Sequence, residues 1–231
     1  MSAKRVAIVQ SNYIPWKGYF DLINAVDEFI LFDTAQYTRR DWRNRNRIKT
    51  RDGLQWLTIP VATRGHYHDA IETIQVSDPT WNERHWRAIR ANYAGAAHFR
   101  TLGPALEALF LDCTGVRLSS INHHFITGLC AILGIPTRLS WSSDYTIVEG
   151  RTERLVSLCR QAGAGVYVSG PAAASYIEPA RFREAEIELV YFDYAGYPEY
   201  RQAFPPFEHG VSVVDLLLNE GPNAPRFMLT F

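Results

Sequence analysis

The sequence predicts an α/β fold, in which a mainly parallel sheet begins with a βαβ unit and is followed by a hairpin and a helical insertion. Two short, fully apolar runs at residues 6–9 and 29–32 flank a segment with helical periodicity. Strand-like and helical segments alternate again in the last third of the chain. The 231 residues, 47% of them apolar and 21% charged, suit one globular domain spanning residues 1–231 and exclude a disordered or fibrous chain.

The N-terminal third predicts the βαβ unit. A buried strand at residues 6–9 is followed by a polar loop at residues 10–18 and a helix over residues 19–26. A second buried strand, at residues 29–32, ends at Asp33. Parallel strands of this kind open a binding site at their carboxyl ends.

The middle of the chain predicts a hairpin over residues 46–50 and 55–61, closed by Asp52 and Gly53. Another strand is expected over residues 71–76. Capping and stop residues then predict a helical insertion at approximately residues 78–134. Its helices are expected over residues 81–93, 104–111 and 116–133.

The last third returns to strand and helix alternation, which favours one α/β domain over two separate ones. The expected strands are residues 137–141, 166–169 and 187–192. The expected helices are residues 151–162 and 212–219.

Charge and cysteine content exclude several classes of protein. Twenty-four basic and 24 acidic residues cancel, which argues against a nucleic-acid partner. Cys113, Cys130 and Cys159 form no CxxC pair and lie in apolar segments, so we expect buried, reduced thiols. No apolar run approaches the ~20 residues of a membrane span, and we expect a soluble, cytoplasmic protein. The oligomeric state stays open.

The loop at residues 10–18 is the first candidate site. It precedes a helix, where Lys17 and Gly18 can bring charge and a close backbone approach to a phosphate. Neither a Walker motif nor GxGxxG is present. A purely structural turn, in which Pro15 and Gly18 set the geometry and Trp16 fills the core, is an equal alternative.

A basic cluster is the second candidate site. Seven Lys and Arg residues lie between Arg39 and Arg51, against one acid, Asp41. Such an excess suits phosphate or carboxylate groups, and Tyr37 and Trp42 add ring surfaces. The alternative is a solvated charged loop, but its place just beyond a strand favours binding.

Two further segments end in polar or small residues. Ser169 and Gly170 follow a predicted strand and offer a hydroxyl and backbone donors at the same sheet edge, and a structural turn is an equal alternative there. His66, His68 and Asp69 lie in a polar loop whose spacing matches no zinc pattern, so no metal is predicted. Whether that loop binds anything stays open.

Several of these segments together resemble the WbqC-like protein family. The most specific are QSNYIPWKGYF at residues 10–20, DTAQY at residues 33–37 and WRNRNRI at residues 42–48. Further matching segments are WLTIPV at residues 56–61, YVSG at residues 167–170 and SVVDLLLNEG at residues 212–221. The resemblance covers nearly the whole chain, and Ser11 departs from it where the family pattern has a proline.

The resemblance implies an enzyme of surface-polysaccharide or modified-sugar biosynthesis. Its expected activity is transfer of an acyl or aminoacyl group to an amino sugar or a similar small amine. The chain start also resembles the nucleotide-binding core of pantothenate synthetases, although Trp16 and Tyr19 stand in the region of their paired histidines. An ATP-dependent carboxylate–amine ligase is therefore one alternative, and a non-catalytic protein that binds a phosphorylated partner is another.

Under the transferase hypothesis, Asp33 and Lys17 are the catalytic candidates, with Asp33 as a base or amine-orienting group. Neighbouring arginines are expected to lower the pKa of Asp33. The substrate-binding candidates, expected to gather in one cleft at the strand ends, are Gln10, Asn12, Tyr13, Trp16, Gln36, Tyr37, Arg43, Asn44, Arg45, Asn46, Arg47, Ser169 and Gly170. The expected partner is an anionic or nucleotide-linked small molecule, ATP among them, with no cofactor assigned.

Overall fold

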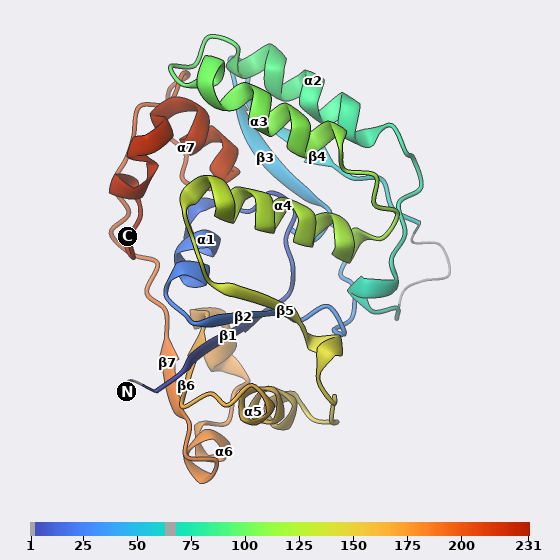
Figure 1. Ribbon diagram of the computed structural model, residues 1–231, viewed down its shortest axis with the longest axis vertical. Coiled ribbons are helices and arrows are strands. Elements are labelled where there is room, and N and C mark those ends of the chain that lie inside the picture. The colour runs from blue at the N-terminus through green and yellow to red at the C-terminus, as the bar shows by residue number, and fades with distance from the viewer. Residues whose placement is uncertain (1–2, 63–67) are drawn as a thin grey trace.

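A five-stranded parallel sheet forms the centre of the computed structural model, which describes residues 3–62 and 68–231 (Figure 1). In spatial order the strands are β5 (Arg138–Trp141), β2 (Glu28–Leu31), β1 (Arg5–Val9), β6 (Val166–Ser169) and β7 (Glu188–Tyr191). Every neighbouring pair is parallel. The predicted mainly parallel sheet is confirmed, and its first two strands, β1 and β2, are direct neighbours.

The strand order reverses between β1 and β6. The chain moves outward from β1 to β2 and β5, then returns to place β6 on the other side of β1. In doubly wound sheets the two loops leaving such a pair of strands diverge, and ligands bind in the crevice between them. The topology therefore marks the carboxyl ends of β1 and β6 as the place to look for a site.

Helices cover both faces of the sheet (Figure 1). Helices α1 (Lys17–Asn24) and α4 (Leu118–Leu133) lie on one face, and α5 (Arg151–Gln161) and α6 (Pro179–Glu184) on the other. Because successive strand residues point to opposite faces, Ala7 joins the core beneath α1 and α4, whereas Val6 and Ile8 join the core against α5. This two-sided burial explains the uninterrupted apolar run of β1.

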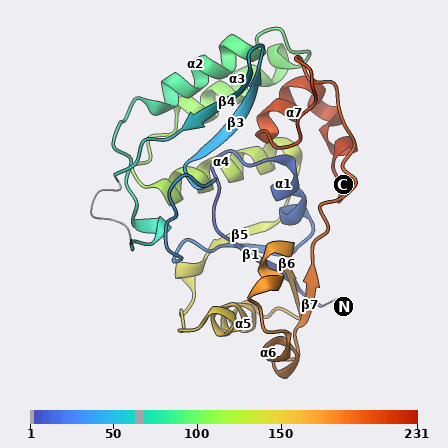
Figure 2. The same cartoon turned by 180° about the vertical axis from the view of Figure 1, so that it is seen from behind.

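The connection from β2 to β5 contains the predicted hairpin and helical insertion. Strands β3 (Arg45–Thr50) and β4 (Gly53–Thr58) form the antiparallel hairpin. Helices α2 (Trp81–Tyr93) and α3 (Phe99–Leu111) lie with it on the far side of α4 from the sheet, beside the C-terminal helix α7 (Val213–Glu220) (Figure 2). Helix α4 thus packs against both layers.

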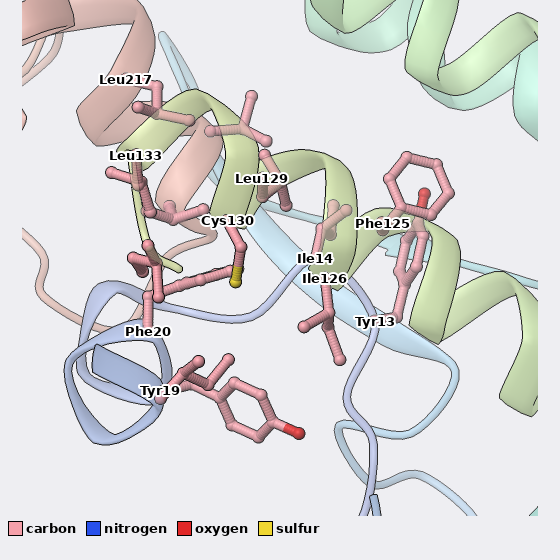
Figure 3. Close-up of a cluster of buried hydrophobic side chains, with 14 of the residues drawn as sticks. Tyr13, Ile14, Tyr19, Phe20, Phe125, Ile126, Leu129, Cys130, Leu133 and Leu217 are labelled. Atoms are coloured by element: carbon pink, nitrogen blue, oxygen red, sulfur yellow. The ribbon is translucent and has the colours of Figure 1, made fainter. Parts of the chain in front are cut away.

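Side chains of α4 fill the space between that helix and the N-terminal segment (Figure 3). Phe125 meets the Tyr13 ring edge-on at a centroid distance of 5.4 Å, and Cys130 lies among apolar neighbours. The expectation of buried, reduced cysteines is confirmed. Burial raises the pKa of Cys113 to about 11 and that of Cys130 and Cys159 to about 12.

Two local predictions are wrong. Residues 71–76 form no strand but a short 3₁₀ turn at Ile71–Thr73, because the Ile71 and Glu72 amides donate to the loop after β2 instead of to a strand edge. Helix α3 begins at Phe99, before the expected start at Pro104. Phe99 stacks on Trp86 of α2, with centroids 6.0 Å apart, and this tertiary contact outweighs the helix-start preference of proline.

The buried His85 predicts a pH-dependent stability. Its Nδ1 lies 2.8 Å from the Tyr13 hydroxyl and its Nε2 lies 3.1 Å from the Thr58 carbonyl, an arrangement that suits the neutral ring. Burial lowers the pKa of His85 to about 4, against about 6.5 in the unfolded chain. Below about pH 6.5, His85 becomes protonated in the unfolded state but stays neutral in the folded state. The free energy of unfolding therefore falls as the pH drops towards 4.

We therefore expect the free energy of unfolding to fall by on the order of 3 kcal/mol over this pH window. His85→Gln removes the titrating group and is expected to flatten that dependence. Urea denaturation at several pH values measures both proteins. If the free energy of unfolding changes equally with pH in the wild type and in the variant, His85 is not the group responsible.

Candidate functional site

A cavity of about 450 Å³ lies at the strand-order reversal. Its walls come from the ends of β1 and β6, the start of α5 and the segments after β2 and β7. The polar and aromatic residues that line it are Gln10, Phe32, Arg43, Arg151, Arg154, Tyr167, Ser169, Tyr176 and Tyr194, together with Gly170. The carboxyl ends of β1 and β6, where the topology predicts a site, therefore border a cavity.

Arginines dominate the electrostatics of this first cavity. Among the described residues that line it, Arg43, Arg151 and Arg154 are basic and none is acidic. The Arg154 guanidinium lies over the Phe32 ring, 5.7 Å from its centroid. The first-turn amides of α5 add positive potential at the same edge. The cavity is suited to a negatively charged ligand.

A second cavity, of about 270 Å³, adjoins the first. It is lined by Asn12, Pro15, Trp16, Trp42, Asn46, His209 and Gly210. Trp16 packs against Tyr194 of the first cavity with ring centroids 5.5 Å apart. Arg43, also from the first cavity, donates to the Asn12 side chain and reaches the Gln10 carbonyl at 3.5 Å. The two cavities therefore share a wall.

The loop between β1 and α1 forms much of that wall and is rigidly fixed. Ile14 has a φ of 35°, a left-handed conformation that is unusual for a β-branched residue. The Asn46 side-chain amide donates to the carbonyls of Tyr13 and Ile14, at 3.1 and 2.9 Å. A Cβ on Gly18 would collide with the Trp16 ring, so glycine is required there. Asn46 and Gly18 thus set the position of the loop.

Asp33 anchors this loop from the end of β2. It is fully buried, and its carboxylate accepts the Ser11 backbone N–H at 2.9 Å and the Ser119 hydroxyl of α4. Burial raises its pKa, so the expected lowering is wrong: the loss of hydration outweighs the positive charge of Arg43. With donors on both oxygens, Asp33 is arranged as a structural anchor.

Lys17 is not among the residues that line either cavity. Its ammonium donates to the Pro198 carbonyl at 2.8 Å and lies over the rings of Tyr197 and Tyr200, at 4.9 and 5.3 Å. Burial lowers its pKa to about 8. The lysine therefore fastens the start of α1 to the segment after β7.

The predicted site residues do not share one cleft, which corrects that expectation. The first cavity gathers Gln10, Arg43, Ser169 and Gly170, and the second gathers Asn12, Trp16 and Asn46. Tyr13 is buried against α2 and α4, and Asn44 donates to the Ile59 carbonyl. The physical reason is that the loop's polar groups satisfy buried backbone atoms.

The remaining substrate-binding candidates lie in strand β3 and in the loop after β2. Arg45 lies over the exposed Trp56 ring, 4.1 Å from its centroid, and Arg47 donates to the Gly210 carbonyl. Tyr37 is buried, whereas Gln36 is exposed and pairs with Ala70 in an isolated β-bridge. Binding roles for all these residues stay predictions.

Four lining residues were not predicted from the sequence, namely Arg151, Arg154, Tyr194 and His209. For β1 we expected the helix that follows a parallel strand to face the site. The same rule would have indicated the two arginines, because α5 is the first α-helix after β5 and begins directly after Gly150. Tyr194 and His209 lie outside helices and strands, where no periodicity marks them.

Two further sequence expectations concern metals and membranes. Within residues 3–62 and 68–231, no group of three or more His, Cys, Asp or Glu side chains is placed to hold a metal ion. His66 lies outside the described residues, so its loop stays unassigned. Among the described helices, none has the length and hydrophobicity needed to span a bilayer.

The anchoring role of Asp33 predicts a stability difference between two variants. Asp33→Ala leaves the Ser11 amide and the Ser119 hydroxyl without their acceptor, at roughly 1–3 kcal/mol for each. Asp33→Asn keeps an acceptor for Ser11 and is expected to cost clearly less. Urea denaturation at neutral pH measures both, with exposed Asp112→Ala as the control, expected within about 0.5 kcal/mol of the wild type. Wild-type stability in both Asp33 variants would contradict the anchor.

Comparison with known proteins places the chain in a family. It is 50% identical over 225 residues to the uncharacterised protein Rv1507c of Mycobacterium tuberculosis, with 97% of each chain covered. No solved structure matches it significantly. The model of the WbqC-like protein family matches residues 10–227, which include the β1–α1 loop, all lining residues of the second cavity and all those of the first except Ile8 and Val9. The chain therefore belongs to the WbqC-like protein family.

Proposed function

We propose that this protein transfers an acyl or aminoacyl group to the amine of a small, phosphate-bearing substrate, such as a nucleotide-linked amino sugar used for surface polysaccharides. The observation that supports this most directly is the arginine-lined cavity at the strand-order reversal. Its volume of about 450 Å³ falls in the range of small-molecule sites. The protein as a whole is electrically neutral, so three arginines around one cavity are a local excess of positive charge.

The chemistry of the lining fits a nucleotide diphosphate. Guanidinium groups match phosphate oxygens with paired hydrogen bonds, and Arg43, Arg151 and Arg154 surround the space in which those oxygens would lie. The rings of Tyr176 and Tyr194 offer faces on which a base can stack. The absence of acids from the described lining avoids repulsion of the phosphates.

Arg43 is the residue best placed to act on the reacting groups, because it lies at the wall between the cavities. Its buried Nε has no hydrogen-bond partner among the described residues, although buried donors are normally paired. In acyl transfer the amine nitrogen bonds to the acyl carbon of an activated donor. The bond between the acyl carbon and the leaving group breaks, and the leaving group departs with the electron pair of that bond and takes up the proton that the amine loses. A guanidinium at this place can stabilise the oxyanion that forms in between.

The ATP-dependent ligase is the second candidate, since the same three arginines would suit a triphosphate. Incubation with ATP and a set of carboxylates and amines separates the two reactions. A ligase releases AMP and pyrophosphate, or ADP and phosphate, in step with amide formation, whereas a transferase forms the amide from an activated donor without ATP. A non-catalytic binding protein would form no amide in either assay.

Removal of one cavity arginine is expected to weaken nucleotide binding. Arg154→Ala should reduce the affinity for UDP by about 10- to 150-fold, the equivalent of roughly 1.5–3 kcal/mol for one charged hydrogen bond. Isothermal titration calorimetry with UDP, ADP and ATP measures the effect. Arg160→Ala, which removes an exposed arginine outside the cavity lining on the same helix, is the matched control.

Two results would contradict the proposed site. One is the absence of binding for all three nucleotides. The other is an equal loss of affinity in Arg154→Ala and Arg160→Ala, which would show that general surface charge, and not this cavity, attracts the ligand.

A further inference from the structure

The second cavity differs in chemistry from the first. Two indoles, from Trp16 and Trp42, face it together with the amides of Asn12 and Asn46 and the imidazole of His209. Among the described residues that line it, none is Lys, Arg, Asp or Glu. The lining is therefore aromatic and polar but formally uncharged, apart from the titratable histidine.

We infer that this second cavity is a carbohydrate subsite, which receives the sugar ring of the substrate beside the arginine-lined site for its anionic part. Indole faces pack against the C–H face of a sugar ring, and the imidazole of His209 can bond its hydroxyl groups. A phosphate would call for cations in the lining, and an alkyl chain would leave the buried Nδ1 of His209 without a partner. The inference rests on the proposed function only in assigning the reacting amine to that ring.

His209 provides an independent sign that a polar ligand is expected here. Its ring packs edge-on against Phe207 at 4.6 Å, and its Nδ1 is buried without a hydrogen-bond partner among the described residues. Such orphaned groups are rare unless water or a ligand completes them. Burial, and secondarily the charge of Lys17, lower the pKa of His209, which favours the neutral ring. A neutral imidazole can both accept and donate a hydrogen bond.

The two cavities lie side by side, so a substrate that extends past the wall between them would contact both. A single layer of side chains separates them, made by the Trp16–Tyr194 ring contact and by Arg43 with Asn12. The strained Ile14 and the Asn46 amide fix the loop that bears Trp16, so the subsite is preformed. A nucleotide-linked sugar would place its ring against the indoles and its phosphates against the arginines.

Two exposed tryptophans of the hairpin region provide a matched pair of variants. Trp42 and Trp56 are 39% and 42% exposed, their ring centroids lie 5.4 Å apart, and both rings contact arginine. Of the two, Trp42 lines the second cavity and Trp56 does not. Because both side chains are largely at the surface, either alanine variant is expected to fold.

The test uses saturation-transfer NMR and titration of the full chain with methyl glucosaminide, which lacks phosphate. We expect transfer to the ring C–H protons, with affinity reduced on the order of tenfold in Trp42→Ala and changed less than about twofold in Trp56→Ala. His209→Ala is expected to weaken binding as well. No transfer in the wild type, or equal losses in both tryptophan variants, would overturn the inference.

A second arm separates this inference from the proposed function. UDP-glucosamine should bind more tightly than UDP, and Trp42→Ala should abolish that gain while leaving UDP affinity unchanged. Arg154→Ala should weaken the binding of both ligands, and UDP-glucosamine should still bind more tightly than UDP. If UDP fails to bind but the glycoside shows the tryptophan dependence, the anion site is wrong and the carbohydrate subsite stands. If UDP binds through Arg154 and binding of the glycoside does not depend on Trp42, the carbohydrate subsite is wrong and the anion site stands.

Discussion

The hydrogen bonds of the buried Asp33 carboxylate are the contacts on which the rest of the site depends. They join the end of β2 to the Ser11 amide at the end of β1 and to Ser119 of α4. Asn122 of the same helix donates to the Ser11 hydroxyl and to the Arg43 carbonyl. Since each buried polar group is costly without its partner, these bonds hold the β1–α1 loop, α4 and the start of the hairpin in one arrangement. Both cavities are lined by segments positioned in this way.

This dependence explains why the polar motif after β1 is not itself the binding surface. A loop that turns from a central strand into a helix buries backbone groups, and Asn46 supplies the donor for two of its carbonyls. Lys17 likewise uses its ammonium on the Pro198 carbonyl. The polar side chains of this loop therefore form hydrogen bonds with buried backbone groups. Most of the positive charge in the first cavity comes instead from the arginines of α5.

The basic residues of the chain divide into two groups with different physical roles. Arg43, Arg151 and Arg154 line a concave space, where their charges converge on one ligand. Arg45 and Arg47 instead pack over the indoles of the hairpin region, which limits their freedom to reach a ligand. A cluster that is continuous in sequence is therefore divided, because Arg43 lies in the loop before β3 whereas Arg45 and Arg47 share one face of that strand.

Elements whose signals are local could be predicted from the sequence. The apolar strands at residues 6–9 and 166–169, the helix over residues 81–93 and the Gly53 hairpin follow from periodicity and turn chemistry, which act between near neighbours in the chain. Contacts between distant segments decided that Ile71–Thr73 form a turn where a strand was expected, that burial outweighs arginine charge at Asp33, and that Tyr194 and His209 line the cavities. Those outcomes depend on which distant segments meet, and the energies of burial and pairing exist only once they do.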